Sequence, residues 1–238
     1  MIQEWQKDLR QYASEDKAKI LSRFFKTGKG EYGEGDQFLG ITVPAIRAVS
    51  RNHSEESVEA IGMMLQSPWH EDRMSALLTL VEQYRRKKSN RKEITDFYVA
   101  NLSRANNWDL IDLSAPKILG EYVAESGETD RLLHLSDHPD LWHQRAAIVA
   151  TLTLIKKGEF SPTILLAEKF LAHPHPLMHK ATGWMLREVG KRSESRLTAF
   201  LDLHTSEMPR TALRYAIERL SAEQRAYYMH LPHRRLKR

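Results

Sequence analysis

Apolar residues recur at helical spacing along almost the whole chain. Near the N-terminus they suit two helices, and the positions concerned are Leu9, Tyr12, Ile20, Leu21, Phe24 and Phe25. Ser14, which acidic residues follow, is a typical N-cap for the second of these helices. Alternating runs of Val, Ile and Thr are nearly absent, and Asn-Gly and Asp-Gly hairpin turns do not occur. The pattern therefore predicts an all-α protein.

Proline and glycine mark the ends of the predicted helices. Prolines stand at three expected helix starts, namely Pro44, Pro68 and Pro162. Glycines that suit C-terminal caps follow three helical runs, at Gly127, Gly158 and Gly190. These boundaries divide the chain into short helices.

A short motif, in which a basic or polar residue leads a helix rich in small residues, recurs along the chain. Its leading positions are Arg73, Asn107, Arg145, Lys180 and Arg210. Successive members lie roughly 30 to 40 residues apart, a period that fits two helices with their turns. We therefore expect an α-solenoid, which curves so that one helix of each pair lines a concave face. The array is expected to form one domain over residues 1–230, with a basic tail over 231–238.

Four of the five leading residues are cations, and in register they would form a ladder that makes the concave face basic. Duplex DNA presents a negative charge about every 1.7 Å of its axis, which such a ladder would match. The alternative is that each cation caps or pairs within its own repeat, and for any single position this is the simpler interpretation. Four cations in register favour a shared surface that binds a polyanion.

Composition limits the class of protein. With 238 residues, of which 41% are hydrophobic and 28% charged, the chain can fold around a full core. It has no cysteine, which excludes a disulfide framework and thiolate catalysis and fits a reducing cytoplasm. The N-terminus lacks the apolar core of a signal peptide, and no run approaches the ~18 apolar residues of a membrane span. We expect a cytoplasmic protein that does not contact membranes and is nucleoid-associated when bound to DNA.

The formal net charge of +5 permits binding to a polyanion without requiring it. Residues 208–238 are the most basic stretch, with eight Arg or Lys against two Glu. A solvated helix face with a frayed tail is the alternative interpretation of that stretch. Nothing in the sequence points to an oligomer, so a monomer is expected.

Two histidine clusters invite comparison with a metal site. They comprise His173, His175 and His179, and His230 with His233. Neither offers two ligands and a carboxylate on one helical face, and prolines interrupt the first. We therefore expect no metal. The glycine patterns of nucleotide-binding proteins and the G-x-S-x-G nucleophile motif are also absent.

Residues 28–36 are rich in glycine and resemble a phosphate cradle at first sight. The carboxylates of Glu31, Glu34 and Asp36 argue against one, because such a nest favours electropositive surroundings. A surface loop between helices is the better interpretation. Tyr32 is expected to reach the concave face from this loop.

The most informative segment is Asn-Asn-Trp-Asp-Leu-Ile-Asp at residues 106–112. On a helix it places Trp108 and Asp112 four positions apart on one face. One interpretation is a groove with a flat apolar wall and a fixed charge; the other is a core tryptophan with Asp112 paired to a cation. A core built only for packing would not set a carboxylate beside an indole, because burying an unpaired charge is costly. Trp184 lies in a similar segment, with Arg187 one turn on.

At these residues the chain resembles the AlkD-like DNA alkylation repair glycosylases, which are built from HEAT-like helical repeats. The matching stretches are residues 106–120, 141–152 and 179–192, and residues 24–47 resemble an N-terminal signature of the wider family. The resemblance covers most of the chain. It implies a monofunctional glycosylase that excises cationic N3- and N7-alkylated purines, such as 3-methyladenine and 7-methylguanine, from duplex DNA in base excision repair.

The resemblance also implies roles for individual residues. Trp108 and Trp184 would pack against the deoxyribose and backbone of the lesion, with Asp112 beside the anomeric carbon. Arg145 matches a family position near the phosphates, and a family tyrosine corresponds to Tyr32. With the ladder added, the expected DNA-binding residues are Arg73, Arg145, Lys180, Arg187, Arg210 and Tyr32. No cofactor is implied.

The residues suit this chemistry independently, because an alkylated purine is already a good leaving group. A placed carboxylate such as Asp112 can stabilise the positive charge that develops on the sugar. Two alternatives remain open. One is a non-catalytic relative that binds DNA structures on the same scaffold. The other is a helical-repeat adaptor that binds proteins and would need neither the basic ladder nor Asp112.

Overall fold

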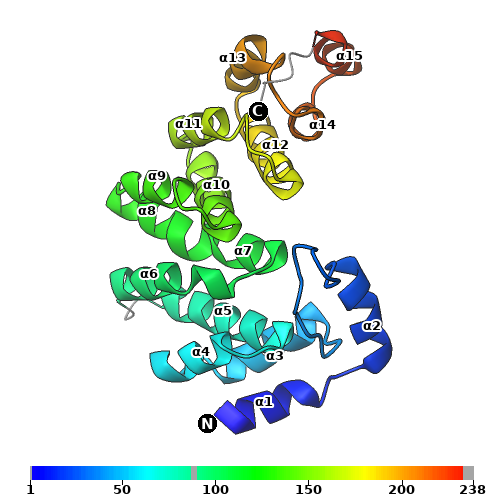
Figure 1. Ribbon diagram of the computed structural model, residues 1–238. Helices are drawn as coiled ribbons and strands as arrows, with labels where there is room; N and C mark the ends of the chain where they lie inside the picture. Colours follow the sequence, from blue (N-terminus) through cyan, green and yellow to red (C-terminus); the bar gives the residue numbers. More distant parts are fainter. Residues whose placement is uncertain (1, 87–89, 233–238) are drawn as a thin grey trace. The chain divides into compact units, whose positions relative to one another are not determined.

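The computed structural model describes residues 2–86 and 90–232, and these parts of the chain are helical with connecting turns (Figure 1). The one strand-like feature in these ranges is an isolated bridge between Gln37 and Trp69. The chain divides into two compact units, Met1–Ile118 and Leu119–Arg238. The predicted all-α class is confirmed, and successive helix pairs give the repeat architecture of an α-solenoid.

The first unit is built around α5. Its helices are α1 (Ile2–Arg10), α2 (Glu15–Phe24), α3 (Val43–Asn52), α4 (Val58–Leu65), α5 (His70–Arg85), α6 (Arg91–Ala100) and α7 (Trp108–Ser114), with a 3₁₀ turn, η1, at Leu102–Arg104. Helix α5 is buried along most of its length and packs against α1, α3, α4, α6 and α7. A helix without a solvent face needs other helices around it, and here five provide that cover.

Helix α2 differs from its neighbours because it buries none of its side chains. Ser14 caps its N-terminus as predicted, and its hydroxyl accepts a hydrogen bond from the backbone N of Lys17. The backbone N of Ser14 donates to the carbonyl oxygen of Leu39, which ties the start of α2 to the loop before α3. Two large apolar side chains of α2, Ile20 and Phe24, are exposed.

The second unit is built around α10 and α12. Its helices are α8 (Glu121–Ser126), α9 (Asp130–Ser136), α10 (Leu141–Lys156), α11 (Ser161–Lys169), α12 (Pro176–Gly190), α13 (Glu194–His204), α14 (Arg210–Ala216) and α15 (Ala222–His230). A short π-helical turn, η2 (Pro116–Gly120), connects the units along the chain. Gly183 permits a close approach of α12 and α14, because a Cβ there would lie 2.4 Å from the carbonyl oxygen of Ala212.

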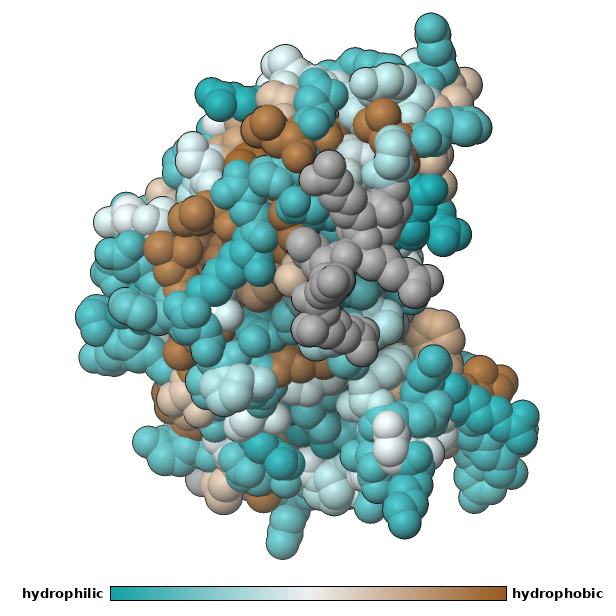
Figure 2. All heavy atoms as spheres, turned by 45° about the horizontal axis from the view of Figure 1, so that its top comes forward, coloured by the Kyte–Doolittle hydropathy of each residue, from teal (hydrophilic) through white to brown (hydrophobic). Residues whose placement is uncertain are grey.

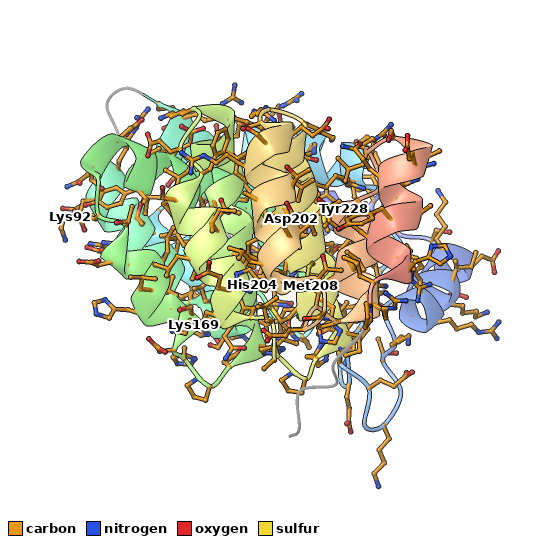
Figure 3. The ribbon with its side chains drawn as sticks, turned by 90° about the horizontal axis from the view of Figure 1, so that it is seen from above. Lys92, Lys169, Asp202, His204, Met208 and Tyr228 are labelled. Atoms are coloured by element: carbon orange, nitrogen blue, oxygen red, sulfur yellow. The ribbon has the colours of Figure 1, made fainter. Side chains whose placement is uncertain are left out.

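The C-terminal helices share one core. Buried side chains of α11 to α15 pack together there, and Met208 between α13 and α14 is fully buried among them. The hydroxyl of Tyr228 on α15 donates to Oδ1 of Asp202 on α13 at 2.9 Å, and Figure 3 shows the two side chains pointing toward one another. His233 and most of the predicted basic tail lie outside the described residues.

Most of the predicted helix boundaries are confirmed. Helices α3 and α11 carry proline at their first positions, and α5 begins two residues after Pro68. Gly127 and Gly158 follow α8 and α10 with φ of 77° and 86°, the left-handed conformation of a C-terminal cap. The prediction for Gly190 is wrong. It is the last residue of α12, and a Cβ there would lie 2.4 Å from Leu197, so this glycine serves close packing against α13.

The repeat motif lies at the starts of α5, α7, α10, α12 and α14, within two turns of each N-terminus. It therefore marks one helix of each successive pair, as the sequence predicted. A single domain over residues 1–230 stays a prediction. The face drawn in Figure 2 is mainly hydrophilic, with hydrophobic residues in separate areas. Within the described ranges, no helix has the length and apolar character needed to cross a membrane.

Candidate functional site

Trp108 is the first residue of α7, and it lies at the boundary between the core and the solvent. Oδ1 of the fully buried Asn107 accepts a hydrogen bond from the backbone N of Trp108 at 2.9 Å, which caps the helix. The indole is half-buried. Its centroid lies 6.1 Å from that of Phe24, in an edge-on contact, and 5.5 Å from that of Phe25. Phe25 is buried whereas Phe24 is 60% exposed, so the contact surface of Trp108 is apolar and partly open.

Further rings continue inward from this contact. Phe25 and Phe38 stack with centroids 5.2 Å apart and planes 8° apart, and His70 stacks on Phe38 at 4.6 Å. Such contacts contribute roughly 0.5–1.5 kcal/mol each beyond the burial of area. We call Phe24, Phe25, Phe38, His70 and Trp108 the aromatic cluster. Its buried members support the ring of Trp108 from the interior side.

A network of buried charges adjoins the aromatic cluster. The two ring nitrogens of His70 face different carboxylates, with Nε2 2.9 Å from Asp109 and Nδ1 3.3 Å from Asp36. Asp36 also accepts hydrogen bonds from Arg73 at 2.7 Å and from Asn106 at 2.9 Å. We call these five residues the charged network. It joins the glycine-rich loop, α5 and the first turn of α7.

The pKa values within the network follow from its contacts. Burial lowers the pKa of His70, but the carboxylates of Asp109 and Asp36 outweigh it and raise this pKa to about 9. Burial raises the pKa of Asp36, but the hydrogen bond to His70 and the guanidinium of Arg73 outweigh it, so that this pKa is lowered. At neutral pH the network therefore contains an imidazolium ion, which donates from both nitrogens.

Asp112 lies one helical turn after Trp108 and is half-buried. The two side chains therefore share one face of α7, as predicted. Burial raises the pKa of Tyr98, and the negative charge of Asp112 raises it further. The site in the first unit thus combines a partly open aromatic surface with a carboxyl group on the same short helix.

In the second unit, Arg145 of α10 is only 4% exposed, and its Nη1 donates to the carbonyl oxygen of Leu177 at 2.7 Å. Leu177 belongs to α12, whose middle carries the half-buried Trp184. Arg187, one turn after Trp184, forms an ion pair with Glu218. Arg145 therefore ties α10 to the helix that presents Trp184 and Arg187.

The structure corrects the predicted ladder at two positions. Arg73 is 2% exposed and donates to Asp36 and to the carbonyl oxygen of Ser67. The expectation of a cation exposed on a shared face is therefore wrong at Arg73, and it is wrong at Arg145 for the same reason. A guanidinium has five donors in a fixed fork and can satisfy several buried acceptors at once. These two arginines use that capacity inside the fold.

The other predicted DNA-binding residues lie nearer the surface. Lys180 is exposed on α12. Arg210 is half-buried at the start of α14 and donates to the carbonyl oxygen of Met229 at 2.8 Å. Tyr32 is half-buried in the glycine-rich loop. Contact of these residues with DNA stays a prediction.

The predicted cluster of His173, His175 and His179 makes hydrogen bonds near the start of α12. Nδ1 of His175 accepts a hydrogen bond from the backbone N of Leu177 at 3.1 Å, as an N-cap. Nε2 of His173 lies 2.7 Å from Oε1 of Gln144. Burial lowers the pKa of both histidines, and neighbouring histidines lower it further. In the part of the chain that the structure describes, no three His, Cys, Asp or Glu side chains are grouped as a metal site requires.

Sequence reasoning assigned the carboxylates of the glycine-rich loop to the surface, and for Asp36 this was wrong. Glu31 and Glu34 are exposed and accept from the backbone N of Gly28 and Gly30. Asp36 is 8% exposed and forms the centre of the charged network. The one sequence signal is the run of four ionisable residues, 70–73, at the start of α5, which indicates charged partners without identifying them.

Two of three comparisons with known proteins found a match. The model of the family described as DNA alkylation repair enzyme matches residues 5–220. A solved structure described as a predicted DNA alkylation repair enzyme from Enterococcus faecalis aligns with a TM-score of 0.69 at 20% identity. That alignment covers 88% of this chain and 97% of the other, and it shows the likeness of the folds. No curated protein matches the chain.

Proposed function

We propose, since the chain belongs to the DNA alkylation repair enzyme family, that it is a monofunctional DNA glycosylase. Its substrates would be cationic N3- and N7-alkylated purines in duplex DNA, whose N-glycosidic bond it hydrolyses in base excision repair. The family implies DNA as the partner. The observation that carries the finer proposal is the pairing of the partly open Trp108 with Asp112 one turn on.

The chemistry explains why a carboxylate suffices. Alkylation at N3 or N7 makes the base positively charged, so the bond between the sugar and the base breaks with its electron pair passing to the base. The sugar gains positive charge as this happens, and a fixed carboxylate lowers the barrier by stabilising that charge. Water then bonds to the anomeric carbon and loses a proton, for which Asp112 is the proposed acceptor. No metal or cofactor has a part in this scheme.

The aromatic cluster supports the proposal for the sugar. The face of Trp108 is proposed to hold the cationic sugar by cation–π attraction, worth on the order of 0.5–2 kcal/mol. Contact of Trp184, in the second unit, with the damaged DNA is a separate proposal. Phe24, which the sequence indicated only as an apolar helix position, adds an exposed ring in contact with Trp108. Contact of Tyr32 with DNA is a separate proposal.

Binding to the DNA backbone is proposed to rest on exposed cations. Lys180 remains from the predicted ladder, and Arg187 and Arg210 are half-buried. Helix α2 and the residues that follow it add five exposed cations, which are Lys17, Lys19, Arg23, Lys26 and Lys29. Neutralising phosphates with such cations releases counterions, so the affinity should fall steeply with salt. We propose a monomer that acts in the cytoplasm and is associated with the nucleoid when it binds DNA.

The test of the proposal is release of 7-methylguanine from methylated duplex DNA. Wild type should release it, and Asp112→Asn should lower the rate constant about 100-fold or more, the usual cost of losing one electrostatic contact to a transition state. Asp96→Asn is the matched control, because Asp96 is a carboxylate of the same unit that forms an ion pair with the exposed Lys92 on α6. Its rate should equal that of wild type.

The other outcomes separate the alternatives. Wild-type protein that binds duplex DNA but releases no methylated base would be a DNA-structure binder on the same scaffold. Failure to bind DNA even at low salt, where phosphate contacts are strongest, would favour a protein-binding adaptor. If Asp112→Asn released 7-methylguanine at the wild-type rate, the glycosylase activity would stand and the proposed role of Asp112 would be refuted.

A further inference from the structure

His70 has no role in the proposed chemistry, yet it contacts the glycine-rich loop, the aromatic cluster and α7. It is the first residue of α5 and is 1% exposed. Its ring stacks on that of Phe38, and its centroid lies 5.2 Å from that of Phe25. The ring of Phe25 in turn contacts that of Trp108. Its Nε2 lies 2.9 Å from Asp109, the residue that follows Trp108. His70 therefore reaches Trp108 both through ring contacts and through the chain.

The hydrogen bonds leave little freedom in the first turn of α7. Oδ2 of Asp109 faces His70, and Oδ1 accepts from the backbone N of Leu110 at 2.9 Å. The Asp109 side chain thus connects the imidazole to the helix backbone between Trp108 and Asp112. A neutral imidazole has one donor and could serve only one of the two carboxylates it faces, whereas an imidazolium serves both.

Among the residues of the charged network itself, the charges balance when His70 is protonated. Asp36 on the loop and Asp109 on α7 are negative, and Arg73 on the same helix as His70 is positive. Arg104, which follows α6, also acts on Arg73 as a positive charge. Removing the proton from His70 would leave the partly buried carboxylate of Asp109 without the cation it contacts, which is costly. The raised pKa of His70, about 9, agrees with this balance.

We propose that His70 is a positioning residue for the site. As an imidazolium ion bridging Asp36 and Asp109, it fixes the first turn of α7 and thereby the placement of Trp108 and Asp112. Its role in catalysis rests on the proposed function. Its role in the placement of Trp108 does not.

The chain contains a matched control. His53, at the end of α3, also lies between two carboxylates, with Nε2 3.0 Å from Asp8 and Nδ1 2.9 Å from Glu56. It also stacks on an aromatic ring, that of Trp5, at 5.1 Å. None of these partners belongs to the aromatic cluster or the charged network. His53→Gln therefore measures the general cost of removing a bridging histidine from this unit.

The first experiment compares His70→Gln with His53→Gln in thermal unfolding, DNA affinity and single-turnover release of 7-methylguanine. Both variants should lose thermal stability. Only His70→Gln should lower the rate constant at saturating DNA, by about tenfold, with its Kd within about twofold of wild type, because small displacements of reacting groups cost rate rather than binding. Equal rate losses in the two variants would overturn the positioning role.

The second experiment needs no glycosylase activity. The indole N–H resonance of Trp108, identified by its absence from Trp108→Phe, is followed by NMR from pH 6 to 10. In wild type and His53→Gln it should shift with a midpoint near 9, and in His70→Gln this transition should be missing. If wild type released no base, the proposed function would fail, and this titration would still decide the placement of Trp108. A Trp108 resonance that does not respond to pH would overturn the proposal.

A second variant covers the case in which His70→Gln does not fold. Asp109→Asn keeps the shape of the side chain and removes one of the two charges that hold the proton on His70. The midpoint of the Trp108 transition should then move to lower pH. A midpoint unchanged in Asp109→Asn would show that another group causes the transition and would overturn the proposal.

Discussion

Two tryptophans that the sequence presents in similar segments are held in different ways. Trp108 lies against the rings of Phe24 and Phe25, and the charged network fixes the turn of helix that carries it. Trp184 lies in the middle of a long helix. Next to Trp184 this helix makes a close backbone contact, because Gly183 lets the backbone of α14 approach closely.

The difference shows that the placement of tryptophans in two similar segments can depend on two different kinds of interaction. The placement of Trp108 depends on charge and therefore on pH, since it uses a buried imidazolium between carboxylates. The placement of Trp184 depends on volume, since it uses the absence of a Cβ at a helix contact. Removal of a charge from the charged network should displace Trp108, and a methyl group added at Gly183 should displace Trp184.

The largest effect is expected from Arg73→Met, which removes the guanidinium from the charged network. Asp36 would remain buried without its closest counterion, and breaking a buried pair in this way costs about 3–5 kcal/mol. The free energy of unfolding from urea denaturation should fall by this amount. The matched control is Lys92→Met, which breaks an exposed pair with Asp96 one turn away on α6 and should cost less than about 0.5 kcal/mol. Figure 3 shows Lys92 at the outer edge of the molecule.

A double variant sharpens the result. Asp36→Leu combined with Arg73→Met replaces both charges by apolar side chains, and it should recover part of the stability that Arg73→Met loses. Equal losses for Arg73→Met and Lys92→Met would contradict the burial of the network and restore Arg73 to the exposed ladder.

Much of the architecture could be predicted from the sequence because helices and their ends depend on local chemistry. The cap at Ser14, the prolines that open α3 and α11, and the left-handed glycines after α8 and α10 are all short-range signals. The shared face of Trp108 and Asp112 follows from helix geometry alone. These features need no knowledge of which segments meet in space.

The charged network could not be predicted because its members are distant in sequence. Asp36 and Arg73 are brought together by the fold, and an aspartate in a glycine-rich loop gives no local sign of burial. For the same reason Arg73 and Arg145 looked like surface cations. Arginine at the start of a helix has the same sequence pattern whether its partner is a phosphate, a buried carboxylate or a backbone carbonyl.

A second, smaller effect should appear as opposite pH responses of the two tryptophan helices. The pKa of His70 is raised from 6.5 to about 9, so its contribution to stability is complete below pH 6.5 and is lost as pH rises through 9. The pKa values of His173 and His175 are lowered, so their contribution is present above pH 6.5 and is lost as pH falls below it. Alkali should therefore loosen α7, and acid should loosen the start of α12.

Amide hydrogen exchange read by mass spectrometry checks this contrast. After correction for the intrinsic effect of pH, peptides from α7 should lose protection between pH 7 and 10, and peptides from α12 should lose it between pH 7 and 5. In His70→Gln the alkaline loss in α7 should disappear while the acid response of α12 remains. Parallel pH responses of the two helices would contradict the distinction between them.

The smallest effect is expected from Gly183→Ala. A Cβ at this position would lie 2.4 Å from the carbonyl oxygen of Ala212 and 2.6 Å from Cβ of Tyr215, so α12 and α14 must move apart. Overpacking of this kind costs about 1–3 kcal/mol. The control is Gly62→Ala in α4, where the nearest atom is Cζ of Phe97 at an ordinary contact distance of 3.6 Å and alanine should stabilise the helix by about 0.5–1 kcal/mol.

Opposite signs for the two substitutions in urea denaturation would establish that the α12–α14 contact, and not glycine in a helix as such, requires Gly183. Gly183→Ala also tests whether the two tryptophans are placed by different kinds of interaction. Because Gly183→Ala acts through volume, the loss of stability should not change between pH 7 and 9, whereas His70 loses its contribution over that range. A loss that grew with pH would tie Trp184 to the same electrostatic control as Trp108 and remove the contrast between them.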